Sequence, residues 1–163
     1  MHPYAQAAVS LDGTDRRLLK ALAATPRSGP VELARRLEVA RNTVQSRLEK
    51  LVAQGVVVGF GPDVDLATVG YVVSAFITLQ IAQGRGSDVT DHLGSIPQVV
   101  EVHRTTGPGD LFCRVVATSN THLSEVLDRI LEVDGIARTT TALVLDTPVP
   151  ARVIPAIDAL PLE

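Results

Sequence analysis

The stretch that decides the fold of the first third of the chain is residues 29–55, GPVELARRLEVARNTVQSRLEKLVAQG. Its apolar residues recur at helical spacing on both sides of a gap of about three residues, which predicts two helices joined by a short turn. The first helix begins at Pro30, where a proline costs no hydrogen bond, and the second runs from about Ala40 to Gln54 before Gly55 ends it. Two helices connected in this way form a helix-turn-helix unit.

A third amphipathic helix precedes this pair. Asp12 is placed to cap its first turn, Asp15 follows at the third helical position, and Thr25-Pro26 marks its end. Its inward stripe consists of Leu18, Leu19 and Leu22. After the helix pair, the apolar run Val56-Val57-Val58 predicts a short strand, which would be the wing of a winged helix-turn-helix domain.

Beyond residue 70 the apolar pattern changes from helical spacing to strand alternation. Between Tyr71 and Ile81, successive side chains alternate between two faces, as they do in a half-buried strand. The predicted elements are a strand at 71–81, a helix at 88–95, strands at 99–105 and 111–117, a helix capped by Asn120 with the stripe Leu123, Val126, Leu127, Ile130 and Leu131, and a strand at 138–145. This order, βαββαβ, is that of a ferredoxin-like domain, so the fold class is α+β.

The domain boundaries follow from these patterns. We assign residues 1–60 to the winged helix-turn-helix domain, 61–69 to a linker, and 70–163 to the ferredoxin-like domain with a C-terminal tail. The tail contains prolines at positions 148, 150, 155 and 161, which argue against one regular element. We therefore expect the tail to drape over its own subunit or a partner subunit.

Charge is distributed unevenly along the chain. Residues 1–60 carry nine Lys and Arg against five Asp and Glu, whereas residues 61–163 carry six against thirteen. A basic first part in a protein of net charge −3 fits a localised surface for a polyanion. The mean hydropathy of +0.22 is high for a soluble chain. Because no apolar run approaches the roughly 18 residues of a membrane helix, we expect the excess apolar surface to lie between subunits.

Cysteine and histidine usage limits the chemistry. Cys113 is the only cysteine, so an intrachain disulfide is impossible, and no two histidines have the spacing of metal ligands. The first ten residues lack the charged start and apolar stretch of a secretion signal. We therefore expect a cytoplasmic protein without a metal, a cofactor or a membrane partner.

The second helix of the pair has the composition of a DNA-reading helix. At about 100° per residue, Val44, Leu48 and Leu51 share one face, which leaves a polar face opposite. Asn and Gln can pair with adenine, Ser and Thr can reach bases or phosphates, and Arg and Lys can neutralise phosphates. The candidate DNA-contacting residues are Arg41, Asn42, Thr43, Gln45, Ser46, Arg47 and Lys50, with Arg27, Arg35 and Arg36 in support. The alternative is an ordinary amphipathic helix with a solvated polar face, and Glu49, which would repel phosphate, favours that alternative.

Several motifs in the chain follow one another in a characteristic order. They are Leu11-Asp12 with Asp15-Arg16 and Leu18-Leu19, Arg27, Glu32-Leu33-Ala34, Thr43 to Leu48 with Leu51, Gly55-Val56-Val57, and Gly107 with Gly109-Asp110. In these motifs the chain resembles the Lrp/AsnC (feast/famine) family of transcription regulators from Leu11 to about Pro150. One departure is the turn Glu38-Val39-Ala40, where relatives often have glycine followed by a capping serine. Ala40 cannot cap, which costs the helix about 1 kcal/mol.

The resemblance implies a sequence-specific regulator of transcription that binds double-stranded DNA and is controlled by an amino-acid effector. It also implies that the second domain pairs sheet to sheet into homodimers, which assemble further into octamers, and that the effector binds between subunits. Glycines in the loop 106–110 permit close backbone approach, so that N–H groups could receive a carboxylate while Asp110 balances an ammonium group. The candidate effector-binding residues are Thr106, Gly107, Gly109, Asp110, Thr139 and Thr141. The same loop would be a good hairpin turn in any protein.

Two other classes of function stay open. An enzyme would need a catalytic constellation, and the sequence has no Ser/His/Asp order, activated cysteine, paired-carboxylate motif or phosphate loop. Cys113 lies in a predicted strand among apolar neighbours, where a packing role is favoured. An interaction module whose helix-turn-helix has lost DNA binding is suggested by Ala40 and Glu49. We predict a regulator and not an enzyme.

Overall fold

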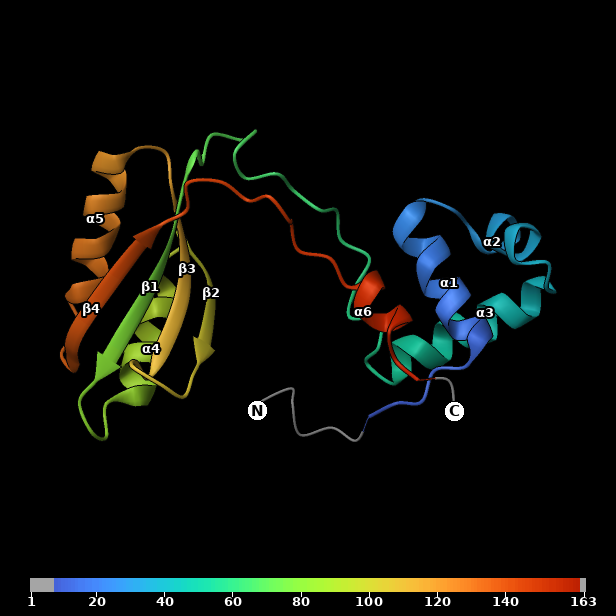
Figure 1. Cartoon of the computed structure of the whole chain (residues 1–163), viewed down its shortest axis with the longest axis horizontal. Helices are drawn as coiled ribbons and strands as arrows, with labels where there is room; N and C mark the ends of the chain where they lie inside the picture. Colours follow the sequence, from blue (N-terminus) through green and yellow to red (C-terminus); the bar gives the residue numbers. More distant parts are fainter. Residues whose placement is uncertain (1–7, 162–163) are drawn as a thin grey trace. The chain divides into compact units, whose positions relative to one another are not determined.

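The computed structural model describes residues 8–161, which fall into two compact units (Figure 1). One unit extends up to Pro62 and takes in the chain again from Val149, and the other is Asp63–Pro148. The N-terminal helices and the sheet therefore belong to separate units, as the change of periodicity near residue 70 predicts.

The first unit is built on α1 (Gly13–Ala24), α2 (Pro30–Leu37) and α3 (Arg41–Ala53). Asp12 caps α1 by accepting hydrogen bonds from the backbone of Thr14 and Asp15, as predicted. Gly29 precedes α2, and Gly55 follows α3 with φ 71°, a left-handed conformation that glycine adopts without strain. The fully buried side chains of Leu18, Leu33, Val44 and Leu51 form the core between these three helices.

One feature of the first unit differs from the sequence prediction. Residues 56–58 form no strand, so the predicted wing strand is wrong. The backbone N–H groups of Val56 and Val57 both donate to the carbonyl of Leu51, and the chain folds back on the end of α3. Glu38, in the predicted turn before α3, has a left-handed backbone with φ 56° and ψ 43°.

The C-terminal tail also differs from the prediction. It contains a short helix, α6 (Ile154–Asp158), whose first turn accommodates Pro155. Ile154 and Ile157 pack against the core of the helical unit, and the ammonium group of Lys20 lies 2.7 Å from the carboxylate of Asp158. The assignment of the tail to the ferredoxin-like domain is therefore wrong, because Ile154 and Ile157 are partly buried against the core of the helical unit.

The second unit is a four-stranded antiparallel sheet with two helices. Its elements are β1 (Val73–Ile81), α4 (Gly86–Ser95), β2 (Val99–Arg104), β3 (Leu111–Ala117), α5 (Asn120–Leu131) and β4 (Ile136–Leu143). The strand order β2-β3-β1-β4 confirms the βαββαβ prediction, and the strand boundaries agree within about two residues.

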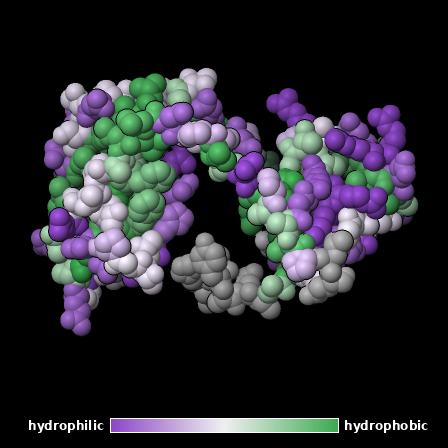
Figure 2. Space-filling model, viewed as in Figure 1, coloured by the Kyte–Doolittle hydropathy of each residue, from purple (hydrophilic) through white to green (hydrophobic). Residues whose placement is uncertain are grey.

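The two faces of the sheet have different surroundings. On one face, Ala75, Ile77 and Leu79 are fully buried in a core shared with α4 and α5. On the other face, Phe76 and Phe112 stack with ring centroids 5.1 Å apart and remain partly exposed. Figure 2 shows hydrophobic residues at the surface of this unit.

Two details of α5 correct the prediction. The residue that caps α5 is Ser119 and not Asn120, because the hydroxyl of Ser119 accepts from the backbone N–H of His122 while Asn120 is the first helical residue. Leu131 is 51% exposed, so it does not belong to the buried stripe.

Within residues 8–161, no helix is long and apolar enough to span a bilayer. No cluster of potential metal ligands forms in that range.

Candidate nucleic-acid interface and effector site

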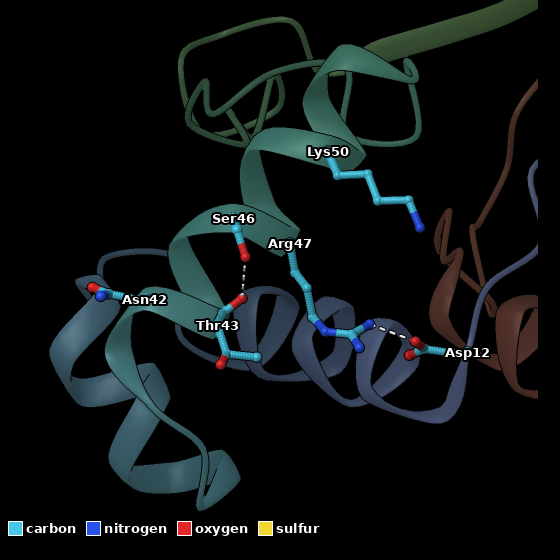
Figure 3. A pocket seen from close by; sticks show the side chains of 6 residues that line it. All are labelled: Asp12, Asn42, Thr43, Ser46, Arg47 and Lys50. Carbon is cyan, nitrogen blue, oxygen red and sulfur yellow. Dashed lines mark hydrogen bonds and ion pairs between the residues drawn. The ribbon is translucent and has the colours of Figure 1, made fainter.

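The polar face of α3 is open to solvent. Arg41, Asn42, Gln45, Ser46 and Lys50 are exposed, and Thr43 is partly exposed, while Val44 and Leu51 hold the opposite side of the helix in the core. An open hollow runs along this face, lined by Asp12, Asn42, Thr43, Ser46, Arg47 and Lys50 (Figure 3). The structure thus gathers the predicted DNA-contacting residues of α3 on one accessible surface.

Two side chains on this surface already have partners within α3. The amide nitrogen of Gln45 donates to the carboxylate of Glu49 at 2.7 Å, and the hydroxyl of Ser46 donates to the carbonyl of Thr43 at 3.2 Å. The contact with Gln45 gives Glu49 a local hydrogen-bond partner but leaves its negative charge in place.

Arg47 lies on the same face but is engaged with α1. Its Nη1 contacts the carboxylate of Asp12 at 2.5 Å (Figure 3). The same nitrogen contacts the carboxylate of Asp15 at 2.8 Å, and the side chain of Asp15 is buried. The hydrogen bond from Arg47 is the main reason why the pKa of Asp12 is lowered, and the same contacts raise the pKa of Arg47. The sequence predicts Arg47 as a contact to DNA but does not reveal its carboxylate partners.

The supporting arginines lie outside α3. Arg27 and Arg35 are exposed, as is Arg36, whose guanidinium donates to the hydroxyl of Thr25 at 3.3 Å. Within residues 8–161, none of them forms an ion pair, and the same holds for Arg41 and Lys50. These five cations therefore carry uncompensated positive charge on the helical unit.

The loop between β2 and β3 is held firmly against the end of β1. The backbone N–H of Asp110 donates to the carbonyl of Leu79, and one carboxylate oxygen of Asp110 accepts from the backbone N–H of Ile81 at 2.7 Å. A Cβ at Gly109 would lie 2.3 Å from the methyl group of Thr78, so only glycine fits there. Gly107 has φ 131°, which other residues rarely adopt.

The remaining candidate effector residues lie on a different strand. Thr139 pairs with Leu79 and Thr141 pairs with Ile77 across the β1–β4 ladder. The 106–110 loop is anchored on the β3 side of β1, so β1 lies between it and both threonines within one chain. Thr106, Gly107, Gly109 and Asp110 are thus brought together, whereas Thr139 and Thr141 are not joined to them.

Comparison with known proteins matches two family models to the chain. Residues 11–58 match the family described as winged helix-turn-helix DNA-binding, and residues 74–154 match the Lrp/AsnC ligand binding domain. The HTH-type transcriptional regulator FL11 of Pyrococcus horikoshii is 31% identical over 139 residues, which cover 85% of this chain and 92% of FL11.

Solved structures give the same result. The structure of Escherichia coli AsnC has a TM-score of 0.84 at 30% identity, covering 90% of this chain and all of that one. The feast or famine regulatory protein of M. tuberculosis in complex with L-methionine has a TM-score of 0.78 at 30% identity, covering 88% and 97%. These relatives confirm the prediction of a regulator rather than an enzyme. The chain belongs to the Lrp/AsnC family of transcription regulators and combines a helix-turn-helix DNA-binding domain with an Lrp/AsnC ligand-binding domain.

Proposed function

We propose that α3 is the DNA-reading element of this regulator and enters the major groove of double-stranded DNA. The observation that carries this proposal is the exposed polar face of α3, which displays Asn42, Thr43, Gln45 and Ser46 between the cations Arg41 and Lys50. Amide and hydroxyl side chains read base edges in the major groove, while flanking cations contact phosphates. Arg27 and Arg36 supply further phosphate contacts from outside the helix.

A binding assay with paired duplexes tests this proposal. An operator is first selected with the wild-type protein from randomised duplexes, and affinity is then measured for the operator and for an unrelated duplex. Asn42→Ala should lower affinity for the operator by about tenfold, since one good base contact is worth 1–3 kcal/mol, and leave the unrelated duplex nearly unaffected. Ser124→Ala, on the exposed side of α5, is the control. Failure to enrich any sequence would contradict specific reading by α3.

We further propose that the ligand-binding domain takes an amino acid between subunits, beside the loop 106–110. The backbone N–H groups of Thr106 and Gly107 donate to none of the described residues, so they are free to receive an effector carboxylate. The second carboxylate oxygen of Asp110 is available for an ammonium group, and Thr139 and Thr141 of a neighbouring copy would complete the site. Support comes from the M. tuberculosis relative, which carries L-methionine.

Calorimetry with each of the twenty amino acids tests the effector proposal. At least one should release heat and raise the melting temperature, and Asp110→Asn should weaken that binding about tenfold by removing the charge opposite the ammonium group. Asp128→Asn, on the exposed side of α5, is the matched control. No heat and no thermal shift from any of the twenty would contradict the proposal.

We propose finally that the protein works in the cytoplasm as a homodimer that assembles into an octamer. The partly exposed Phe76 and Phe112 on the uncovered face of the sheet support pairing with a second copy. Dimers place two DNA-reading helices in successive grooves, which a single copy cannot do.

A further inference from the structure

Asp12 and Asp15, at the start of α1, both cap this helix and contact Arg47 of α3. Oδ1 of Asp12 accepts from the backbone N–H groups of Thr14 and Asp15, both at 2.8 Å, while Oδ2 contacts Arg47. Asp15 divides its oxygens in the same way, because Oδ2 accepts from the backbone N–H of Asp12 and Oδ1 accepts from Arg47. The capping box of α1 and the guanidinium of α3 therefore form one hydrogen-bonded cluster, which we call the Asp12–Asp15–Arg47 clasp.

The charge of this clasp is unsuited to a phosphate contact. Two carboxylates face one guanidinium, so the cluster carries a net negative charge, and the side chain of Asp12 is 53% exposed beside the open hollow. A DNA phosphate that approached Arg47 would also approach Asp12 and be repelled. Lys50 lines the same hollow without an ion pair among residues 8–161, so it is the cation suited to bind phosphate there.

The clasp also joins α1 to the face of α3 that carries Asn42 and Ser46. Arg47 is partly buried, Asp15 is buried, and the two are 32 positions apart in the chain. The contact holds one side of α3 against the start of α1 and so opposes rotation of α3 about its own axis. Base-edge hydrogen bonds tolerate little displacement, so such a rotation would misplace Asn42 and Ser46.

We propose that Arg47 is a positioning residue for sequence reading and does not contact phosphate. The clasp sets the angle at which α3 presents Asn42 and Ser46, and its loss lowers discrimination between sequences more than general affinity. This inference rests on the proposed role of α3 as the DNA-reading element. A failure of this inference can be distinguished from a failure of that role. An Arg47 that contacts phosphate and an Arg47 that positions α3 predict different dependences of DNA affinity on salt concentration.

The experiment compares Arg47→Ala with Lys50→Ala on a selected operator and on an unrelated duplex over a range of salt concentrations. A cation that contacts one phosphate contributes about 0.9 to the slope of log K against log salt concentration. Lys50→Ala should lower this slope by about 0.9 and weaken both duplexes about equally. Arg47→Ala should leave the slope unchanged and reduce the ratio of operator to unrelated affinity by about tenfold.

The variant Asp12→Asn provides a second test, in which the two roles considered for Arg47 predict different results. If Arg47 bound phosphate, Asp12→Asn would free it and remove a repulsive charge, so that affinity would rise equally on both duplexes and the ratio of operator to unrelated affinity would stay unchanged. If the clasp positions α3, Asp12→Asn should lower the ratio of operator to unrelated affinity, in the same direction as Arg47→Ala. Because an asparagine oxygen still caps α1, this variant also serves if Arg47→Ala fails to fold.

Two results would overturn the proposal. They are a slope reduced by about 0.9 in Arg47→Ala, and an unchanged ratio of operator to unrelated affinity in Asp12→Asn. Failure of the proposed function looks different, because the wild-type protein would then bind the operator and the unrelated duplex equally.

Discussion

Glu38 holds the left-handed backbone conformation of the turn between α2 and α3, with φ 56° and ψ 43°. A residue with a Cβ is strained there by roughly 1–2 kcal/mol, whereas glycine is not. Its side chain is exposed and forms no ion pair within residues 8–161. We therefore expect Glu38→Gly to raise the free energy of unfolding by about 1 kcal/mol, measured by urea denaturation. Glu38→Gln keeps the Cβ and should have little effect, and a glycine variant less stable than wild type would contradict the explanation.

Asp12 gives the stability a defined dependence on pH. Its contact with Arg47 holds its pKa below the ordinary value of 3.8, so the carboxylate stabilises the folded state above the unfolded pKa. That contribution is lost as pH falls below about 4 towards the folded pKa. Asp12→Asn should therefore be less stable than wild type at pH 7, and the difference should shrink as pH falls below about 4. Asp128→Asn controls for the loss of an exposed carboxylate, and a difference that stays constant with pH would contradict this expectation.

Cys113 should be chemically silent in the folded protein. Its side chain is fully buried in the middle of β3, and burial raises the pKa of its thiol to about 11. The thiolate fraction near pH 8 is then about 100-fold below that of an ordinary cysteine, and reagents have no access. A disulfide reagent should react at least about 100-fold faster in denaturant than in buffer. Rapid labelling in buffer would show that the core opens at β3.

At the scale of elements, the sequence predicts well whatever depends on neighbours along the chain. Asp12 and Gly55 mark helix ends through their own backbone chemistry, and alternation along β1 separates its two faces. The exposed face of α3 follows equally from helical spacing. These predictions required no knowledge of distant contacts.

Predictions that depended on distant or alternative contacts were wrong. Val56 and Val57 suit a strand by propensity, but their N–H groups bond to the end of α3 and no partner strand faces them. Ser119 and Asn120 are equally good caps, and only the backbone conformation selects Ser119. The clasp could not be predicted from the sequence, because Asp12 and Arg47 are 35 positions apart and meet only through helix packing.

The tail helix α6 gives an expectation for element stability. Arg16 is buried and donates to the carbonyls of Leu160 and Pro161, both at 2.6 Å, while Ile157 packs on the helical core. Ile157→Ser should lower the free energy of unfolding of the helical unit by about 1–2 kcal/mol, since it removes a partly buried apolar side chain. Limited proteolysis should then cut the tail faster than in wild type. Val153→Ser, at an exposed position, is the control, and equal cleavage would contradict the packing.

At the scale of the whole molecule, the composition and the sheet both support association of this chain with a second copy of itself. The chain is unusually apolar for its size, and β1 and β3 leave Phe76 and Phe112 uncovered on the face opposite α4 and α5. Exposed aromatic side chains surrounded by polar neighbours such as Thr78 and Arg114 are typical of surfaces between protein subunits. A second copy paired on this face would cover both aromatic rings, so assembly can be tested through one side chain.

Phe76→Glu should therefore separate the subunits. A charged side chain between the paired sheets would lose its hydration, at a cost of several kcal/mol that one contact with the neighbouring Arg114 does not offset, so light scattering should show the mass of a smaller species. Ser124→Glu adds the same charge on the outer side of α5 and should leave the mass unchanged. Two half-sites can be bound together only by two joined copies of the protein. The Phe76→Glu protein should therefore bind a complete operator with the same affinity as a single half-site. An unchanged mass would place the contact between subunits elsewhere, and an unchanged preference for the complete operator would mean that the DNA-reading helices are paired by another surface.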